Sequence, residues 1–228
     1  MFDTLYIILH VTYFIVYRSY SRCEVKLIDF GSSCYTSDHL TTYIQSRSYR
    51  APEVVLGCKY DQRIDVWSIG GVLAELYTGY VLFQNDSLPS MLARITGILG
   101  PFPEHVLQSG SETNKYFTLS NVVYEPMASP NAHNSDAHSS GYNLIYPKKT
   151  TLAKRLHLPS YNGMDGSSCP ATEFDTLSSD DLLFLDFTNK LLNLDHTRRL
   201  TAAQALKHPW LADAGLNRDE YSYTHPDL

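Results

Sequence analysis

The sequence predicts a mainly α-helical fold with one short strand near its start, and three observations support this prediction. Apolar residues recur at mostly helical spacing over residues 64–77, which indicates a long helix. Two capping-box patterns precede further helical segments in the last third of the chain. A single run at 25–28, Val-Lys-Leu-Ile, predicts a strand that ends at a turn. We therefore expect one helical lobe rather than a complete sheet domain.

Composition narrows the classes of protein to which the chain can belong. Its 228 residues carry 24 Asp and Glu against 18 Lys and Arg, a net charge of −6, and no basic stripe. This balance argues against a dedicated nucleic-acid binder. The four cysteines form no C-x-x-C pair and the nine histidines show no metal-binding spacing. We expect reduced thiols in an intracellular protein of the cytoplasm or nucleus.

The first 18 residues differ in character from the rest. Residues 4–17 contain no charged side chain and are rich in β-branched and aromatic residues, which favours a buried strand or an apolar tail. A signal peptide requires a basic start, whereas Asp3 precedes this run, and a membrane helix requires about 20 apolar residues. We interpret 1–18 as unrelated to the remainder of the chain, such as translated intron, an alternative exon or the start of a truncated gene.

Two helices are predicted in the middle of the chain. The first covers 64–77 with Gly79 as its C-cap, and its apolar residues surround most of the helix, as in a buried helix. The second covers 88–99, with Pro89 tolerated in its first turn. Residues 101–150 show no sustained period. Within them, 128–141 predicts a mobile insert because Ser, Asn, His and Gly dominate it.

The last third of the chain predicts two more helices. Ser178 followed by Asp181 forms a capping box before a leucine-rich segment, and Thr201 with Gln204 repeats that pattern. The second of these helices is expected to continue through Lys207 and stop at His208-Pro209. The polar tail, 212–228, is expected to fray.

Five motifs occur one after another in a fixed order. Asp-Phe-Gly stands at 29–31, Ser-Tyr-Arg-Ala-Pro-Glu at 48–53, Asp-Val-Trp-Ser-Ile-Gly at 65–70, Leu-Asp-His-Thr-Arg-Arg-Leu-Thr-Ala at 194–202, and His-Pro-Trp at 208–210. Each is weak alone, but their order and spacing together make chance implausible. Over residues 19–211 the chain resembles the C-terminal half of a eukaryotic protein kinase, with the activation segment between its first two motifs.

Local sequence narrows the resemblance further. Residues 29–34 (Asp-Phe-Gly-Ser-Ser-Cys) and 43–53 (Tyr-Ile-Gln-Ser-Arg-Ser-Tyr-Arg-Ala-Pro-Glu) resemble the dual-specificity tyrosine-regulated (DYRK) kinases of the CMGC group. Residues 19–24 and 82–87 look most like the plant-type branch. One position departs from the usual Y-x-Y pattern, since Thr41 stands where the first tyrosine is expected. The resemblance implies phosphoryl transfer from ATP to Ser and Thr of protein substrates, with autophosphorylation on tyrosine.

The resemblance also implies structural and metal-binding roles. Asp29 would hold the Mg²⁺ that bridges the ATP phosphates, and Gly31 would allow the turn at the end of that motif. Glu53 and Arg199 would form a buried ion pair. Asp65, at the start of the long helix, would brace the backbone of the catalytic loop.

Regulatory and substrate-binding roles are implied for the next stretch. Tyr43 is expected to be the autophosphorylated tyrosine, with Arg47 and Arg50 as partners of its phosphate. Gln45, Ser46 and Arg47 would then shape the substrate-binding site beside the acceptor hydroxyl.

Several kinase elements are missing from the 228 residues. They contain no G-x-G-x-x-G loop, no V-A-I-K lysine and no H-R-D catalytic loop. We therefore expect a kinase C-terminal lobe without the N-lobe sheet or the catalytic loop, inactive by itself, to which ATP and Mg²⁺ do not bind tightly. Two alternatives stay open: a non-catalytic binding module that competes for a kinase's partners, and a membrane-attached fragment that uses the apolar start.

Overall fold

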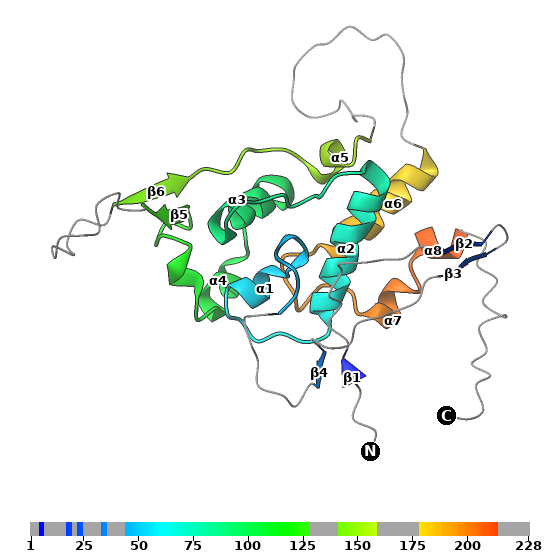
Figure 1. Ribbon diagram of the computed structural model, residues 1–228, viewed down its shortest axis with the longest axis horizontal. Coiled ribbons are helices and arrows are strands. Elements are labelled where there is room, and N and C mark those ends of the chain that lie inside the picture. Colours follow the sequence, from blue (N-terminus) through cyan, green and yellow to red (C-terminus); the bar gives the residue numbers. More distant parts are fainter. Residues whose placement is uncertain are drawn as a thin grey trace, which may run out of the picture.

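Helices predominate in the part of the chain that the computed structural model describes, namely residues 5–6, 17–19, 22–24, 33–35, 44–127, 141–158 and 178–213 (Figure 1). The α-helices are α1 (Pro52–Val55), α2 (Arg63–Thr78), α3 (Leu88–Leu99), α4 (Glu104–Ser109), α5 (Leu152–Arg155), α6 (Ser179–Leu191), α7 (Ala202–Ala205) and α8 (Pro209–Asp213). The strands form antiparallel pairs: β1 (Leu5–Tyr6) with β4 (Cys34–Tyr35), β2 (Tyr17–Ser19) with β3 (Arg22–Glu24), and β5 (Val123–Pro126) with β6 (Tyr142–Ile145). The mainly helical prediction is confirmed, while the strand predicted at 25–28 lies outside the described residues.

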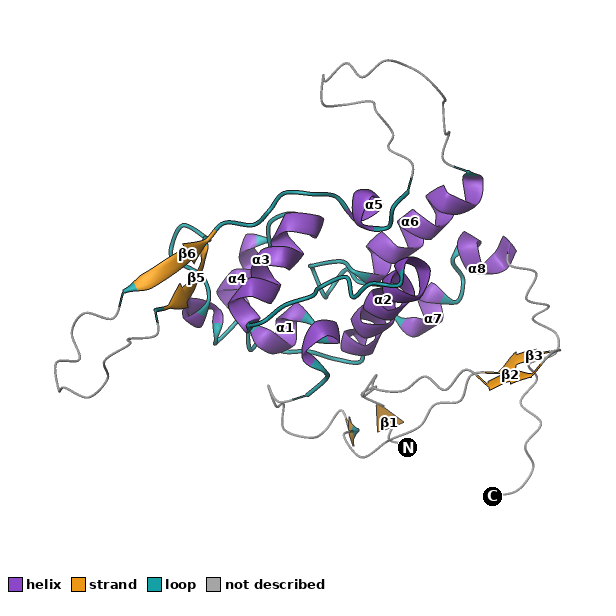
Figure 2. Ribbon diagram, turned by 45° about the horizontal axis from the view of Figure 1, so that its top comes forward, coloured by secondary structure: helices purple, strands orange, loops and turns teal. Residues whose placement is uncertain are grey.

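Helix α2 forms the centre of the lobe. It lies between α1 and α3 on one side and α6 and α7 on the other (Figure 1, Figure 2). Its Trp67 is fully buried and stacks on Phe83, with ring centroids 5.3 Å apart. The helix ends at Gly79, whose φ of 78° is the left-handed conformation that the predicted C-cap requires.

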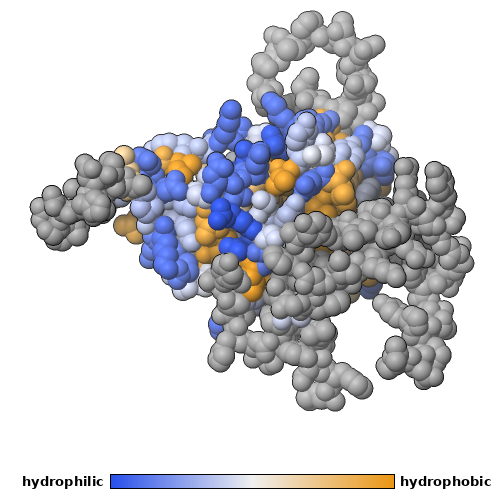
Figure 3. Space-filling view, viewed as in Figure 1, coloured by the Kyte–Doolittle hydropathy of each residue, from blue (hydrophilic) through white to orange (hydrophobic). Residues whose placement is uncertain are grey.

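The expectation of a buried helix holds for most of the α2 surface, including Ile64, Trp67 and Ala74, and fails along one stripe. Ile69 is 38% exposed and Leu76 is 68% exposed, whereas the opposite face contacts α6 and the 3₁₀ turn η2 (Arg47–Tyr49). Helical period alone cannot separate a helix buried on one side from one that is surrounded, because both carry many apolar residues. Tyr77 and Tyr80 extend the exposed apolar surface at the end of this helix. Figure 3 shows apolar and polar residues interspersed over the visible part of the lobe.

Capping boxes set where three of the described helices begin. The predicted pairs Ser178 with Asp181 and Thr201 with Gln204 both form, and each satisfies backbone N–H groups at the first turn of α6 or α7. A third capping box, Ser87 with Ser90, starts α3 at the predicted residue. Side-chain oxygens close to their own backbone act locally, which explains why the sequence predicts these starts well.

The region 101–150 contains regular structure that its sequence does not predict. Helix α4, the 3₁₀ turn η3 (Thr113–Lys115) and the β5–β6 hairpin all lie there, with Val123 opposite Ile145 at one end of the hairpin. These elements are too short to produce a sustained period. Residues 128–140 of the predicted mobile insert lie outside the described part of the chain.

The end of the lobe also differs from the prediction. Helix α7 ends at Ala205 instead of Lys207, and Pro209 begins α8 rather than only stopping a helix. Proline is favoured at a first helical position because no N–H is needed there. Trp210 of α8 packs against Phe184 and Phe187 of α6, with ring centroids 5.0 and 5.1 Å apart. Among the described residues, no helix combines the length and apolar character that crossing a membrane requires.

Candidate functional site

The predicted site residues divide into two sets. Asp29, Gly31 and Tyr43 lie outside the described residues, so their proposed roles stay predictions. The structure places the others, Gln45, Ser46, Arg47, Arg50, Glu53, Asp65 and Arg199, around α1 and the first half of α2. These residues form a platform consisting of residues 44–53 and the side chains that hold them.

Glu53 and Arg199 come together although 146 positions separate them in the chain. Arg199 Nη1 donates to Glu53 Oε1 at 2.5 Å and Nη2 donates to Oε2 at 2.9 Å, a bidentate pair. Both residues are 1% exposed. Because the two charges are removed from water, each depends on the other for its solvation.

Arg199 also uses its remaining donors inside the protein. Its Nε and Nη2 donate to the carbonyl of Asn193 at 3.1 and 3.0 Å, and Nη1 donates to the carbonyl of Arg63 at 3.0 Å. The guanidinium carbon lies 5.0 Å from the centroid of the Trp67 ring. This single side chain therefore joins α1, the start of α2 and the turn before α7.

The turn that carries Arg199 is itself anchored by Asp195. This carboxylate accepts hydrogen bonds from the Thr197 hydroxyl at 2.6 Å and from the Thr197 backbone N–H at 3.1 Å, and His105 Nε2 lies 3.1 Å away. Burial acts to raise the pKa of Asp195, but these hydrogen bonds outweigh it and the pKa is lowered. The Arg199 N–H donates to the Asp195 carbonyl at 3.0 Å, so the backbone and the side chain of Asp195 together hold the turn that presents the arginine.

Gln45 has a backbone conformation that is uncommon for a residue with a side chain. Its φ is 62°, in the left-handed region, and its side chain is buried. The side-chain amide donates to the Ile64 carbonyl at 3.0 Å and to Ser68 Oγ at 2.8 Å, and it accepts from the Ala51 N–H at 2.9 Å. Three internal hydrogen bonds offset the backbone strain. Gln45 thus shapes the platform through its backbone, while its side chain faces inward.

Arg50 holds the other side of the same bend. Its Nε donates to the Ile44 carbonyl at 2.8 Å and its Nη2 donates to the Gln45 carbonyl at 2.9 Å. Ile44 directly follows Tyr43 in the chain, so Arg50 contacts the backbone next to the predicted phosphorylation site.

Arg47 and Ser46 lie at the outer edge of the platform. Arg47 is exposed and its Nη1 donates to the Asp86 carbonyl at 3.0 Å, one residue before the N-cap of α3. Ser46 is half-buried. The edge predicted to meet a substrate is therefore tied to the start of α3.

Tyr49 makes two hydrogen bonds that the sequence motifs do not predict. Its hydroxyl donates to Glu75 Oε2, and its carbonyl accepts from Ser68 Oγ at 2.9 Å. Burial, followed by the hydrogen bond to Glu75 and the charge of that carboxylate, raises the pKa of Tyr49 to about 12. Tyr49 and Glu75 are 26 positions apart, and neither residue type signals such a pairing in the sequence.

The described residues provide no metal site. No group of three or more His, Cys, Asp or Glu side chains among them could hold an ion. Asp65 lies half-buried in the first turn of α2, and its proposed contact with a catalytic loop stays a prediction. Among the described residues the platform is a preformed bend of the backbone, held by hydrogen bonds from Gln45, Arg50 and Ser68.

Comparisons with known proteins match most of the chain. The protein kinase domain family profile matches residues 15–211. The chain is 37% identical over 198 residues, 87% of its length, to dual specificity tyrosine-phosphorylation-regulated kinase 3 of Rattus norvegicus and of Homo sapiens. It is 35% identical over 197 residues to dual specificity tyrosine-phosphorylation-regulated kinase mbk-2 of Caenorhabditis elegans.

The matches cover only part of these relatives. They include 31% of the rat and human proteins and 22% of the nematode protein, so the chain spans about a third of the length of those relatives or less. The family match, by contrast, covers most of the chain and includes the platform, α2 and the Arg199 turn. The chain therefore belongs to the protein kinase family, and dual-specificity tyrosine-phosphorylation-regulated kinases are among its relatives.

Proposed function

We propose that this chain is the substrate-facing part of a kinase of the DYRK family, of the plant-type branch. A kinase that contains it would transfer the γ-phosphoryl group of ATP to Ser or Thr of protein substrates and would phosphorylate its own Tyr43. The observation that carries the proposal is the platform, in which Gln45 in the left-handed conformation and Arg50 hold residues 44–50 against α2. A rigid peptide-binding edge beside the acceptor hydroxyl is what protein phosphorylation requires.

Charge next to Tyr43 supports the regulatory part of the proposal. Arg50 is close to the Ile44 backbone, and Arg47 is exposed nearby. A phosphate on Tyr43 carries nearly two negative charges, and guanidinium groups are its preferred partners. Phosphorylation would then add charge-assisted hydrogen bonds to the internal bonds that already hold the platform.

We propose that the 228-residue chain alone binds ATP only weakly. Its sequence lacks the phosphate-binding loop, the lysine and the catalytic loop, and Mg²⁺ is normally held by carboxylates together with the nucleotide phosphates. Isothermal titration calorimetry with Mg-ATP should give a Kd weaker than about 100 μM, equivalent to roughly −5.5 kcal/mol. Tighter binding would show that the chain contains an unrecognised nucleotide site.

The function itself is tested by a chimera. Residues 19–228 are joined to the N-terminal half of the rat relative's kinase domain and produced in a bacterium without tyrosine kinases. We expect phosphate on Tyr43 by mass spectrometry and phosphoryl transfer to a basic protein substrate, since the chimera regains a nucleotide site. The 228-residue chain, produced in the same way, should carry unmodified Tyr43.

Matched variants identify the role of Tyr43 in the chimera. Tyr43→Phe should lower activity toward the protein substrate because the loop loses its phosphate, whereas Tyr80→Phe, a change at an exposed tyrosine on the end of α2, should leave activity unchanged. A folded chimera that binds ATP but phosphorylates neither Tyr43 nor substrate would contradict the proposed function. Phosphotyrosine at Tyr43 in the isolated chain would contradict its proposed inactivity.

A second function is favoured by the same platform. The hydrogen bonds of Gln45 and Ser68 lie within residues 44–68. The other bonds of the platform, to Glu75, Asp86 and Arg199, also come from this chain, so the substrate-facing edge needs no nucleotide to form. The isolated chain could therefore act as a non-catalytic binding module that competes for a kinase's partners. Adding it to an active DYRK kinase should then inhibit phosphorylation of a protein substrate, and Arg47→Ala should weaken the inhibition.

A further inference from the structure

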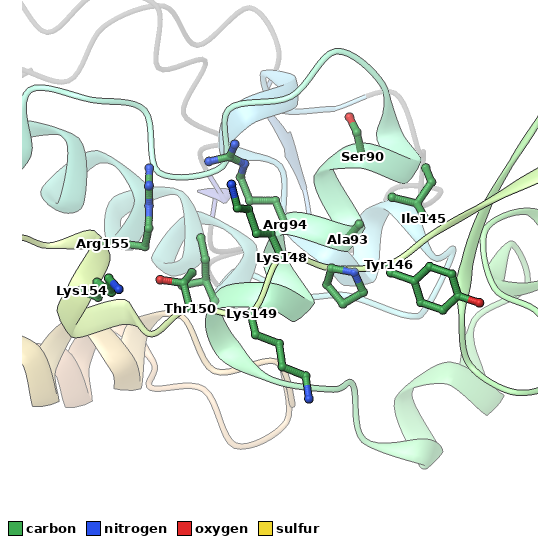
Figure 4. A pocket seen from close by; sticks show the side chains of 12 residues that line it. Ser90, Ala93, Arg94, Ile145, Tyr146, Lys148, Lys149, Thr150, Lys154 and Arg155 are labelled. Carbon is green, nitrogen blue, oxygen red and sulfur yellow. The ribbon is translucent and has the colours of Figure 1, made fainter. Parts of the chain in front are cut away.

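A strongly basic cavity lies along α3. It has a volume of about 470 Å³ and lies between α3, α5 and the segment 145–150 that connects β6 to α5 (Figure 4). Five cationic side chains line it: Arg94, Lys148, Lys149, Lys154 and Arg155. No Asp or Glu is among the lining residues. This concentration of positive charge contrasts with the net charge of −6 of the whole chain.

The charges of this basic cavity are not neutralised from within the described part of the chain. The ion pairs found there involve other residues, and none includes any of the five cations. Arg155 Nε is shielded from solvent and has no hydrogen-bond acceptor among the described residues. Because that nitrogen is shielded, it offers no contact to a ligand in the cavity. An anion held by the other nitrogens of the five cations would neutralise charge that the described residues leave unpaired.

The wall that carries the lysines is closely packed against α3. The Thr150 N–H donates to the Gly97 carbonyl at 2.9 Å, and a Cβ on Gly97 would lie only 2.6 Å from the Lys148 carbonyl oxygen. Only glycine permits this close approach of two backbones. Thr151 then caps α5, whose Lys154 N–H donates to its hydroxyl at 3.2 Å. The lysines therefore extend from a backbone whose position is fixed by the contacts with α3 and by the cap of α5.

The cationic side chains of the cavity point in different directions. In Figure 4 the ends of Arg94, Lys148 and Arg155 point toward one side of the cavity, whereas Lys149 points toward the opposite side. Two guanidinium groups and one ammonium on the same side match an oxyanion with several acceptor oxygens, because each guanidinium can donate two parallel hydrogen bonds.

We propose that this basic cavity binds a phosphorylated Ser or Thr side chain of a protein substrate. The inference rests on the proposed function and extends it, since it adds a phosphate-recognition subsite to the substrate-binding platform. The two sites are linked through α3: Arg47 of the platform bonds to the Asp86 carbonyl just before that helix, and Ser90 of its first turn lines the cavity. A bound peptide could thus occupy the platform and place an existing phosphate in the cavity.

The shape of the site favours a phosphopeptide over nucleic acid or a membrane surface. The cations surround a recess instead of forming a stripe, and the apolar side chains of Ile98, Ile145 and Pro147 also line it. A recess with mixed lining suits one phosphorylated side chain and its neighbours, whereas a polyanion or lipid surface is recognised by an extended basic face.

The test is fluorescence anisotropy with the 228-residue chain. The probe is a fluorescein-labelled mixture of short degenerate peptides with phosphothreonine fixed at the centre, compared with the same mixture containing threonine. We expect the phosphorylated mixture to bind at least about tenfold more tightly. The double variant Arg94→Gln/Arg155→Gln should lose that difference, whereas Lys207→Gln, which removes an exposed cation near α7, should retain it. Far-ultraviolet circular dichroism checks that each variant is folded.

Three results would overturn the proposal. The first is equal affinity for the phosphorylated and unphosphorylated mixtures. The second is a phosphate preference that survives in the Arg94→Gln/Arg155→Gln variant. The third is tighter binding, with the same arginine dependence, to duplex DNA or to phosphatidylserine-containing vesicles than to the phosphopeptides. None of these binding measurements involves phosphoryl transfer. Loss of the phosphopeptide preference would therefore leave the kinase proposal intact. An inactive chimera would contradict the kinase proposal and leave the binding data interpretable.

Discussion

The Glu53–Arg199 pair and the basic cavity use the same chemical group in opposite ways. Arg199 is buried, and its donors reach a carboxylate and two backbone carbonyls. Arg94 and Arg155 line an open recess, and neither belongs to an ion pair of the described residues. An arginine whose acceptors are all internal contributes to stability, whereas one left without acceptors contributes to binding. The comparison separates structural from ligand-binding cations within one lobe.

Removing either member of the buried pair should have the largest effect. Glu53→Ala or Arg199→Ala leaves an uncompensated buried charge, which should lower the free energy of unfolding by about 3 to 5 kcal/mol. The double variant should lose less than the sum of the two single changes, because the remaining charge is removed as well. Urea denaturation followed by tryptophan fluorescence measures the free energy of unfolding of the unchanged chain, both single variants and the double variant. Strictly additive changes would show that Glu53 and Arg199 do not interact. The chimera can carry the cycle if the isolated chain aggregates through the exposed apolar face of α2.

The backbone contact at Gly97 should give the next largest effect. Gly97→Ala places a methyl group against the Lys148 carbonyl, which should destabilise the chain by about 1 to 3 kcal/mol and weaken phosphopeptide binding. Gly71→Ala in α2 is the matched control, because its Cβ would meet Tyr49 at an ordinary 3.4 Å. That change should stabilise the helix by roughly 0.5 to 1 kcal/mol. Thermal melts compare the two, and equal effects would mean that the close approach at Gly97 is unimportant.

Tyr49 tests the platform through pH. Tyr49→Phe should cost about 1 kcal/mol near neutral pH, because the hydrogen bond to Glu75 is lost. The pKa of Tyr49 is raised from 10.0 to about 12 in the folded chain. Its contribution is therefore complete below pH 10 and is lost as the pH rises toward 12, since only the unfolded state releases its proton readily in that range. The stability difference between the two proteins should shrink above pH 10, and a constant difference would argue against this hydrogen bond.

The smallest effect on stability is expected in the basic cavity. Arg94→Gln and Arg155→Gln should each change the free energy of unfolding by no more than about 0.5 kcal/mol, because neither arginine has an ion-pair partner in the described structure to lose. Relief of the repulsion among the five cations acts in the favourable direction. Urea denaturation under the conditions used for Arg199→Ala gives a direct comparison. A loss as large as that of Arg199→Ala would mean that the cavity arginines are structural.

Local sequence predicts those parts of the fold whose causes are local. The capping boxes at Ser178 and Thr201, and the glycine C-cap at Gly79, depend on side chains and backbone within a few residues of each other. The hairpin in 101–150 and the helix that begins at Pro209 escaped prediction because short elements depend on the side chains that pack against them.

By itself, the sequence determined the kinase resemblance and the main helices, because ordered motifs and helical periodicity can be recognised in the order of the residues. The resemblance in turn implied that Glu53 pairs with Arg199. Only the tertiary structure decided which face of α2 is covered, how Gln45 and Arg50 bend the platform, and that Tyr49 reaches Glu75. It also assembled the basic cavity from Arg94, Lys148 and Arg155. Charges distant in sequence act together only after folding sets the distances between them, and electrostatic and hydrogen-bond energies depend on those distances.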